Sequence, residues 1–331
     1  MTNSFYLTKP KTQPQKIWRW GQISTTLAFM AINLWANPSL ALDPFRSSNP
    51  KPIGEKTGAA FRAIFQDGNY RSAENLLKEA EAQEPNEPLA LALLASLAYL
   101  KQDNNNLNSY ASKTLATAQK LTASDRLRGN IYTAVGYALE AGYIMSRDGT
   151  VKGTPQAMTK LQQVFQYFDN ASAISAEDPE LNLLKGYMDL MLGLYLPFSN
   201  PDQGISQLQK YAGPRYLANR GMALGYREMK QFDKALDLAN QALKDTPNNP
   251  EIEYLKAQLL VRKGNKSEAS KGFDAALSKS EQLPKELVAQ IFFEQCRNTR
   301  EIDGKNRDCP ALRNQIKNTP GDWGPKVLPK L

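Results

Sequence analysis

Residues 231–276 read QFDKALDLANQALKDTPNNPEIEYLKAQLLVRKGNKSEASKGFDAA and contain two copies of one pattern. Ala235 recurs as Ala269 and Ala242 recurs as Ala276, each 34 residues further along the chain. A period of this length is typical of helix–turn–helix units that stack side by side, because one unit cannot bury its apolar face alone. The stretch therefore predicts an all-α solenoid rather than a domain built around a single core.

The same pattern occurs near the start of the chain. Gly68, Ala73 and Ala80 have the spacing of the later copy, in which Gly264 takes the place of Gly68. Ala73 and Ala80 are seven residues apart, so they share one face of a helix. Small side chains on that face let the paired helix approach closely, and larger ones would push it away. We therefore expect a first unit at about residues 54–87.

These glycine and alanine spacings resemble the tetratricopeptide repeat (TPR) family over about residues 54–283. Tyr132, Val135 and Gly136 also match the spacing of the family's W-x2-L-G signature, with conservative replacements. The resemblance implies a right-handed TPR-type α-solenoid of about six helix–turn–helix units. Its first helices would line a concave groove that binds peptide segments. An amphipathic pattern at 286–299 predicts a C-terminal capping helix over the last repeat.

Three stretches depart from the repeat pattern. The polar run 102–106 predicts a turn that is longer by about four residues. The stretch 146–155 (SRDGTVKGTP) predicts a solvated insertion loop, which is either a neutral excursion or a contact for a partner. The stretch 181–198 is apolar enough to resemble a membrane segment. Lys185 and Asp189 would be costly at mid-bilayer, so we expect a buried helix there.

The first 41 residues have the pattern of an export signal. A basic start without acidic residues precedes the mostly apolar run 23–36, and cleavage is expected after Ala41. The run is shorter than the roughly 20 apolar residues of a membrane span; an uncleaved anchor and an organelle transit peptide are the alternatives. We expect a protein exported to a periplasm or a thylakoid-type lumen. In this it is similar to exported cyanobacterial TPR proteins of unassigned activity.

Cleavage would change the charge and leave three segments. The formal net charge is +8, and removing the four basic residues of the first 41 positions leaves +4. That charge is too low to indicate nucleic-acid binding, and no membrane span is expected after cleavage. The remaining chain divides into an extended lead-in at 42–53, the solenoid with its cap at 54–316, and a flexible tail at 317–331.

The chain has no histidine and two cysteines. Histidine is the usual general base and the commonest metal ligand, so we expect no enzymatic activity, no metal and no cofactor. In an exported protein, Cys296 and Cys309 are expected to form a disulfide that fastens the cap to the segment after it. A redox-active pair is the alternative, but these cysteines lack the C-x-x-C spacing.

The family's register assigns a set of tyrosine, arginine and glutamate side chains to the concave groove. They are Arg62, Tyr99, Tyr137, Glu140, Tyr187, Arg220, Arg227 and Tyr254. Tyrosine and arginine are enriched at binding hot spots, and the set suits a peptide that carries carboxylates. The alternative is that the tyrosines pack between neighbouring repeats with their hydroxyl groups at the surface.

The sequence thus predicts a scaffold that binds a protein or peptide partner, in assembly or maintenance of an envelope or lumenal complex. Two other functions stay open. Carboxylate pairs such as Glu79 with Glu81, or Asp303 with Asp308, would serve an envelope enzyme if a pocket brought them together. The apolar stretch 181–198 would instead pack against a second copy in a self-associating structural protein.

Overall fold

The computed structural model describes residues 43–195 and 200–331. The predicted signal segment and its cleavage site at Ala41 lie outside the described residues. Within them the chain forms α-helices, one short 3-10 helix and an isolated β-bridge, with no β-strand. The helices are α2 (Glu55–Phe65), α3 (Tyr70–Gln83), α4 (Pro88–Leu100), α5 (Asn104–Leu121), α6 (Arg126–Ile174), α7 (Pro179–Tyr195), α8 (Asp202–Lys210), α9 (Arg215–Glu228), α10 (Phe232–Asp245), α11 (Pro250–Arg262), α12 (Lys266–Leu277), η1 (Ser280–Gln282), α13 (Lys285–Asp303) and α14 (Cys309–Lys317).

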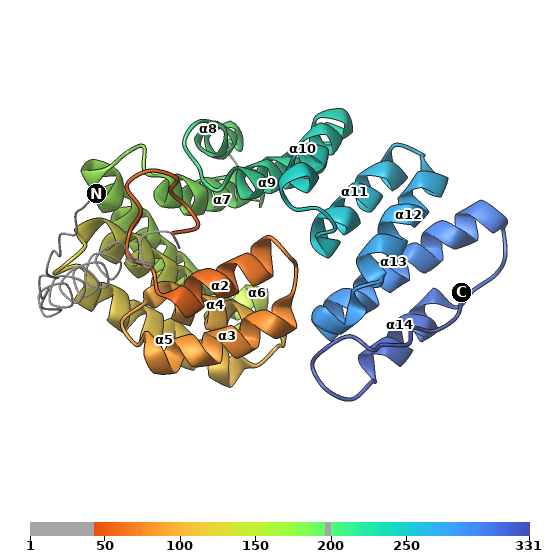
Figure 1. Ribbon diagram of the computed structural model, residues 1–331, viewed down its shortest axis with the longest axis horizontal. Helices are drawn as coiled ribbons and strands as arrows, with labels where there is room; N and C mark the ends of the chain where they lie inside the picture. The colour runs from red at the N-terminus through yellow and green to blue at the C-terminus, as the bar shows by residue number, and fades with distance from the viewer. Residues whose placement is uncertain (1–42, 196–199) are drawn as a thin grey trace, which may run out of the picture.

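Neighbouring helices pair in the order of the chain. Close contacts join α2 with α3, α4 with α5, α5 with α6, α7 with α8, α9 with α10, α11 with α12, α12 with α13 and α13 with α14. Figure 1 shows these pairs following an arc, from α2–α5 through α7–α9 to α11–α14. The prediction of an all-α solenoid is confirmed.

The alanines of the repeat lie where paired helices touch. All of them are 0% exposed: Ala73, Ala80, Ala235, Ala242, Ala269 and Ala276. A larger side chain at any of these positions would displace the partner helix, which is why the sequence keeps them small.

The connection between α4 and α5 is shorter than predicted. It covers only Lys101 to Asp103, because α5 already begins at Asn104. The carboxylate of Asp103 accepts a hydrogen bond from the backbone N–H of Asn106 at 3.0 Å and so caps the helix. Most of the polar run therefore forms the first turn of α5 and does not lengthen the loop.

The prediction of a loop at 146–155 is wrong. These residues are helical, and the chain reverses direction at Gly149, where φ is +71° and ψ is 178°. The two arms of α6 are antiparallel, and a Cβ on Gly153 would lie 3.1 Å from the carbonyl oxygen of Ile144. Glycine enters this backbone region without steric cost, so a single residue turns the chain and the residues on either side stay helical.

The apolar stretch that begins at Leu181 forms α7, while Phe198 lies outside the described residues. Leu181 and Leu190 are buried in the chain's own core, as predicted for this helix. Lys185 Nζ lies 2.9 Å from Asp189 Oδ2, which is the i, i+4 ion pair that the spacing allows. None of the described helices combines the length and the apolar character that a membrane crossing requires.

The tail at 317–331 was predicted to be flexible, but its backbone is docked. Trp323 forms an antiparallel β-bridge with Pro284. Lys101 Nζ lies 3.1 Å from Asp322 Oδ2 and 4.8 Å from the centroid of the Trp323 ring. The β-bridge and the contact between Lys101 and the Trp323 ring hold this proline-rich segment in place, although its residues do not favour a helix.

The cap contains the expected disulfide. Cys296 of α13 and Cys309 of α14 are bonded, with their Cα atoms 5.7 Å apart. Both cysteines are buried, so the bond between the capping helix α13 and α14 lies in the interior of the protein.

The first unit touches the last repeats and closes the arc. Asn249 is 1% exposed, and its Nδ2 donates to the carbonyl oxygens of Phe65 and Gln66, each at 3.1 Å. Gly68 has φ of +64°, and a Cβ there would lie 2.5 Å from Pro250. The turn between α2 and α3 therefore lies against the start of α11, in contact with a unit about 180 residues away.

Candidate functional site

A groove between α9, α11 and α13 gathers the polar side chains of three successive first helices. It has a volume of about 620 Å³. On α13, Gln290, Glu294 and Arg297 are spaced by four and three residues, so they share one helix face. On α11, Gln258 and Arg262 are four residues apart and share a face in the same way. We call this space the C-terminal groove.

A row of hydrogen bonds crosses the floor of the C-terminal groove from helix to helix. Arg227 Nη1 donates to Gln258 Oε1 at 2.6 Å, and Gln258 Nε2 donates to Glu294 Oε2 at 3.0 Å. Gln290 Nε2 donates to Glu294 Oε1 at 2.8 Å. Each side chain fixes its neighbour, so the floor is held in one arrangement before any ligand arrives.

Two arginines of the C-terminal groove have no acidic partner. Arg262 and Arg297 are exposed, and neither forms an ion pair within the described residues. The Arg297 guanidinium lies 5.8 Å from the centroid of the Phe293 ring. By contrast, Glu301 is already paired with Lys266 at 2.9 Å. The two arginines are available to a carboxylate, which a guanidinium binds in a bidentate manner.

Of the residues assigned to the groove from the sequence, Arg227 and Tyr254 lie at the C-terminal groove. Arg227 lines it, and Tyr254 lies beneath on α11 with its ring 6.1 Å from that of Phe273. Burial and the charge of Glu294 raise the pKa of Tyr254, so its hydroxyl stays protonated at neutral pH.

Arg220 and Tyr187 lie instead in the interior, close to the contact between the first unit and α11. Arg220 Nη2 lies 3.0 Å from Glu251 Oε2, and the pair is mostly buried. The Tyr187 hydroxyl donates to the carbonyl oxygen of Leu217 at 2.7 Å, and burial raises its pKa to about 12. Tyr70 of the first unit is buried beside Arg220 and Glu251. Tyr187 thus packs between helices, as the alternative interpretation expected, but its hydroxyl is bonded to the backbone inside the protein and does not lie at the surface.

Tyr137 and Glu140 belong to the hairpin of α6. Tyr137 stacks on Tyr167 of the opposite arm with 5.7 Å between ring centroids. Lys160 Nζ lies 2.6 Å from Glu140 Oε2. Both residues therefore hold the two arms together and are separated from the C-terminal groove.

The last two residues of the set lie apart from the others. Arg62 is half-buried on α2. Tyr99 is 55% exposed and lines a small apolar cavity of about 320 Å³ with Leu100 and Leu139. The structure therefore divides the predicted groove residues among several places.

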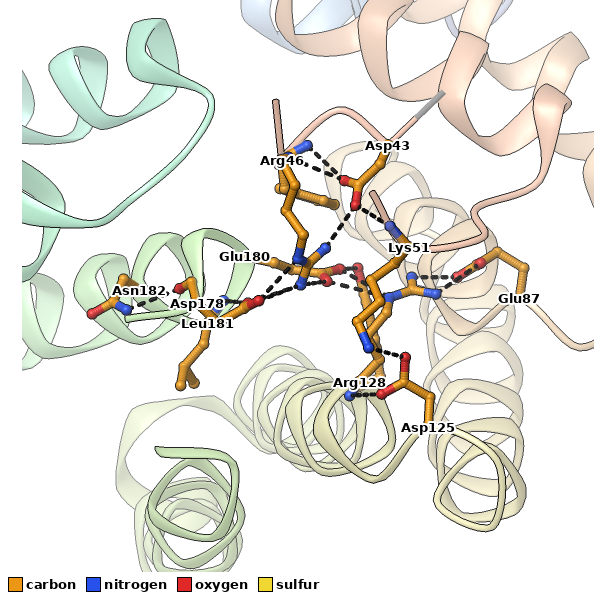
Figure 2. A network of polar contacts seen from close by, with 12 residues as sticks. Asp43, Arg46, Lys51, Glu87, Asp125, Arg128, Asp178, Glu180, Leu181 and Asn182 are labelled. Carbon is orange, nitrogen blue, oxygen red and sulfur yellow. Dashed lines mark hydrogen bonds and ion pairs between the residues drawn. The ribbon is translucent and has the colours of Figure 1, made fainter. Parts of the chain in front are cut away.

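A buried ionic network holds the lead-in (Figure 2). Arg46 Nη1 lies 2.9 Å from Asp43 Oδ2, and Arg46 Nη2 lies 2.8 Å from the Asp178 carboxylate. The same Nη2 lies 2.9 Å from Glu180 Oε2. A second link joins Lys51 of the lead-in to the acidic side chain at the start of α6, which is Asp125. The lead-in is therefore bound to the starts of α6 and α7.

Arg128 completes the network from the other side of Glu180. Its Nε lies 3.2 Å from Glu180 Oε2, and its Nη2 lies 2.8 Å from Glu87 Oε1. The Tyr132 hydroxyl donates to Glu180 Oε1 at 2.6 Å. Burial alone would lower the pKa of Arg128, but Glu180 and Glu87 outweigh this and raise it. The sequence gives no sign of this cluster, because its contacts join residues as far apart as Arg46 and Glu180, which are separated by 134 positions.

A cavity of about 1260 Å³, larger than the C-terminal groove, opens beside this network. The lead-in and the starts of α6, α7 and α9 line it. The acidic side chains that it shares with the network, Asp43, Asp125 and Asp178, all have a basic partner. We therefore assign the network a structural role.

The carboxylates of the two pairs that were considered for an enzyme each bind another group of the protein. Glu79 pairs with Lys56, Glu81 with Lys113, and Asp303 with Arg307. Asp308 caps α14 by accepting from the N–H of the residue three positions later. In the described residues no cluster of three or more acidic or cysteine side chains could hold a metal ion.

One family model matches part of the repeat region. Residues 226–291 match the tetratricopeptide repeat family model. This segment carries tetratricopeptide repeats. It includes α10, α11, α12 and the start of α13. Two of these helices, α11 and α13, line the C-terminal groove. The predicted family resemblance is confirmed, and a TPR solenoid is a scaffold for interactions between proteins. Among curated proteins, no sequence matches this chain significantly.

Several solved structures are similar to the chain at low identity. A tetratricopeptide repeat protein from Parabacteroides merdae is 15% identical, with a TM-score of 0.40 over 80% of this chain and 96% of that one. A thermophilic TPR protein from Thermus thermophilus is 20% identical, with a TM-score of 0.29 over 74% and 97%. A chain of the APC/C hetero-tetramer Cut9–Hcn1 is 13% identical, with a TM-score of 0.33 over 89% and 60%.

Proposed function

We propose that this protein is an exported TPR scaffold, and that its C-terminal groove binds a carboxylate-bearing segment of a partner protein. The observation that carries the proposal is the pair Arg262 and Arg297, which line the groove without an acidic partner in the described residues. A charge-assisted contact with a carboxylate is worth more than a neutral one, and the ordered floor lowers the entropy cost of binding. Binding is an equilibrium with no covalent step.

The structure changes which residues should be tested. Arg220 is buried against Glu251, so replacing Arg220 with an acidic residue would disturb folding as well as binding. Arg262 and Arg297 are exposed, and their reversal alters the groove and leaves the core intact. A change of their charge therefore reports on binding.

The test is crosslinking in cells with the tagged protein, followed by mass spectrometry. The double variant Arg262→Glu, Arg297→Glu is expected to lose the captured partner. The matched control is Lys244→Glu, Lys271→Glu, which places the same charge change on exposed positions of α10 and α12. This control should keep the partner. Equal capture by both double variants would overturn the assignment of the groove.

Export is tested separately. The expected result is that the protein fractionates with a periplasm or lumen and that its amino-terminal sequence begins at the residue after Ala41. A chain that keeps its first 41 residues and stays in the cytosol would overturn this part of the proposal.

A further inference from the structure

Glu294 at the floor of the C-terminal groove is a half-buried carboxylate without a cation. Its Oε1 accepts from Gln290 Nε2 at 2.8 Å, and its Oε2 accepts from Gln258 Nε2 at 3.0 Å. Both donors are neutral amides. No lysine or arginine of the described residues forms an ion pair with it. A carboxylate in a partly buried site gains most from a cationic donor, because neutral donors leave its charge uncompensated.

Within the described residues, none of the arginines of the groove forms an ion pair with Glu294. Arg227 reaches Gln258 Oε1 at 2.6 Å and Glu228 Oε1 at 2.8 Å. The guanidinium of Arg297 lies over Phe293. Glu228 and Glu301, the remaining carboxylates of the groove, are paired with Arg227 and with a lysine of α12. Within the described lining, Glu294 is thus the acidic group whose cation is missing.

We propose that Glu294 binds a lysine or arginine side chain of the same bound segment whose acidic residues Arg262 and Arg297 receive. The inference rests on the proposed function of the same groove. It specifies the ligand as a segment that carries a basic residue as well as acidic ones. A purely acidic segment is disfavoured, because one of its carboxylates would approach Glu294.

The experiment uses three short dye-labelled peptides and fluorescence anisotropy. The parent is acetyl-Asp-Leu-Lys-Leu-Asp-amide, so no chain terminus contributes charge. In the second peptide norleucine replaces lysine, and in the third asparagine replaces both aspartates. We expect the wild-type protein to bind the parent roughly tenfold more tightly than the norleucine peptide, the gain of one charge-assisted contact.

Two protein variants locate the effect. Glu294→Gln should remove the preference for lysine, because it removes the charge and keeps the shape of the side chain. Glu301→Gln is the matched control, since Glu301 lies in the same groove but already has Lys266 as partner at 2.9 Å. It should keep the preference. Because the lysine is changed in the peptide, the comparison within each protein does not depend on the stability of the variant.

The outcomes separate this inference from the proposed function. Equal binding of the parent and norleucine peptides to the wild type overturns the role of Glu294, while weaker binding of the asparagine peptide still supports the groove as a carboxylate site. Equal binding of the parent and asparagine peptides overturns the proposed function. Binding of none of the three peptides at millimolar concentration overturns both.

Discussion

Arg46, Arg128 and Glu180 meet inside the molecule, and their charges compensate one another only as a set. Arg46 lies 2.9 Å and Arg128 lies 3.2 Å from Glu180 Oε2. Each of these side chains is at most 4% exposed. Moving such groups from water is costly, so the removal of one partner leaves a buried charge that nothing balances.

The first prediction is that Arg46→Met destabilises the protein by about 3–5 kcal/mol, because three carboxylates lose their shared cation. Urea denaturation measures the change, and limited proteolysis between residues 43 and 53 should become faster. Lys271→Met is the control, because its ion pair with Glu268 is exposed and contributes little to stability. Equal losses in the two variants would contradict the structural role of the network.

The second prediction concerns pH and Asp125. Burial opposes the charge of Asp125, but Lys51 and the backbone N–H of Arg128 outweigh it and hold its pKa below 3.8. A carboxyl whose pKa is lower in the folded state stabilises the fold above the unfolded-state pKa, and this stability is lost as the pH falls through the folded-state pKa.

Lys51→Met should therefore lower the free energy of unfolding more at pH 6 than at about pH 2, because Asp125 becomes protonated as the pH falls through its folded-state pKa and no longer offers a charge to Lys51. Urea denaturation at the two pH values measures the difference. An equal loss at both would mean that Lys51 acts through packing of its stem and not through its charge.

Only some residues of the C-terminal groove could be predicted from the sequence. Arg227 and Tyr254 followed from the repeat register and from their residue types. Gln258 and Glu294 did not, because an amide and a carboxylate on a helix surface are usually solvated, and only the approach of α9, α11 and α13 puts them in one hydrogen-bonded row.

At the scale of single elements, the hairpin of α6 depends on Gly149. Its φ of +71° with ψ of 178° is a region that other residues enter only with strain. Gly142, in the helical part of the same element, would place a Cβ in open space. The two glycines are therefore expected to respond to alanine in opposite directions.

The third prediction is that Gly149→Ala destabilises the protein by about 1–3 kcal/mol, whereas Gly142→Ala stabilises it by about 0.5–1 kcal/mol. Thermal unfolding followed by circular dichroism compares the two variants under the same conditions. A gain in stability from Gly149→Ala would show that the chain does not need the reversal at this residue.

Elements with regular spacing were predictable from the sequence, and those without it were not. The buried alanines marked the helix pairs of the first and last units correctly, because close contact between helices requires small residues at fixed intervals. The stretch 146–155 has loop-like composition, yet its residues extend two helices that support each other. Packing against the opposite arm decided the conformation there, and local propensity did not.

At the scale of the whole molecule, the contact between the first unit and α11 decides the shape. Asn249 has two roles in it. Its Oδ1 accepts from the N–H groups of Glu251 and Ile252 and caps α11, while its Nδ2 donates to the carbonyl groups of the α2–α3 turn. An aspartate can perform the first role but cannot donate in the second.

The fourth prediction is that Asn249→Asp loosens the closed arc and leaves α11 helical. Hydrogen exchange at the α2–α3 turn should become faster, and the radius of gyration from small-angle X-ray scattering should increase. Asn69→Asp is the matched control, because Asn69 caps α3 in the same way and, among the described residues, its amide donates no hydrogen bond to α11. Unchanged scattering and exchange in Asn249→Asp would show that other contacts hold the arc closed.

The sequence by itself determined the repeated helix pairs and the capping helix, because these depend on contacts between neighbours that recur at a fixed period. It also indicated the pairing of Cys296 with Cys309. Only the tertiary structure decided that Arg220 lies beside Tyr70 of the first unit, that Arg46 is buried among carboxylates, and that the tail returns to Lys101. Those contacts join segments far apart in the chain, and the curvature that brings them together is the sum of many small rotations between helices, which no local spacing records.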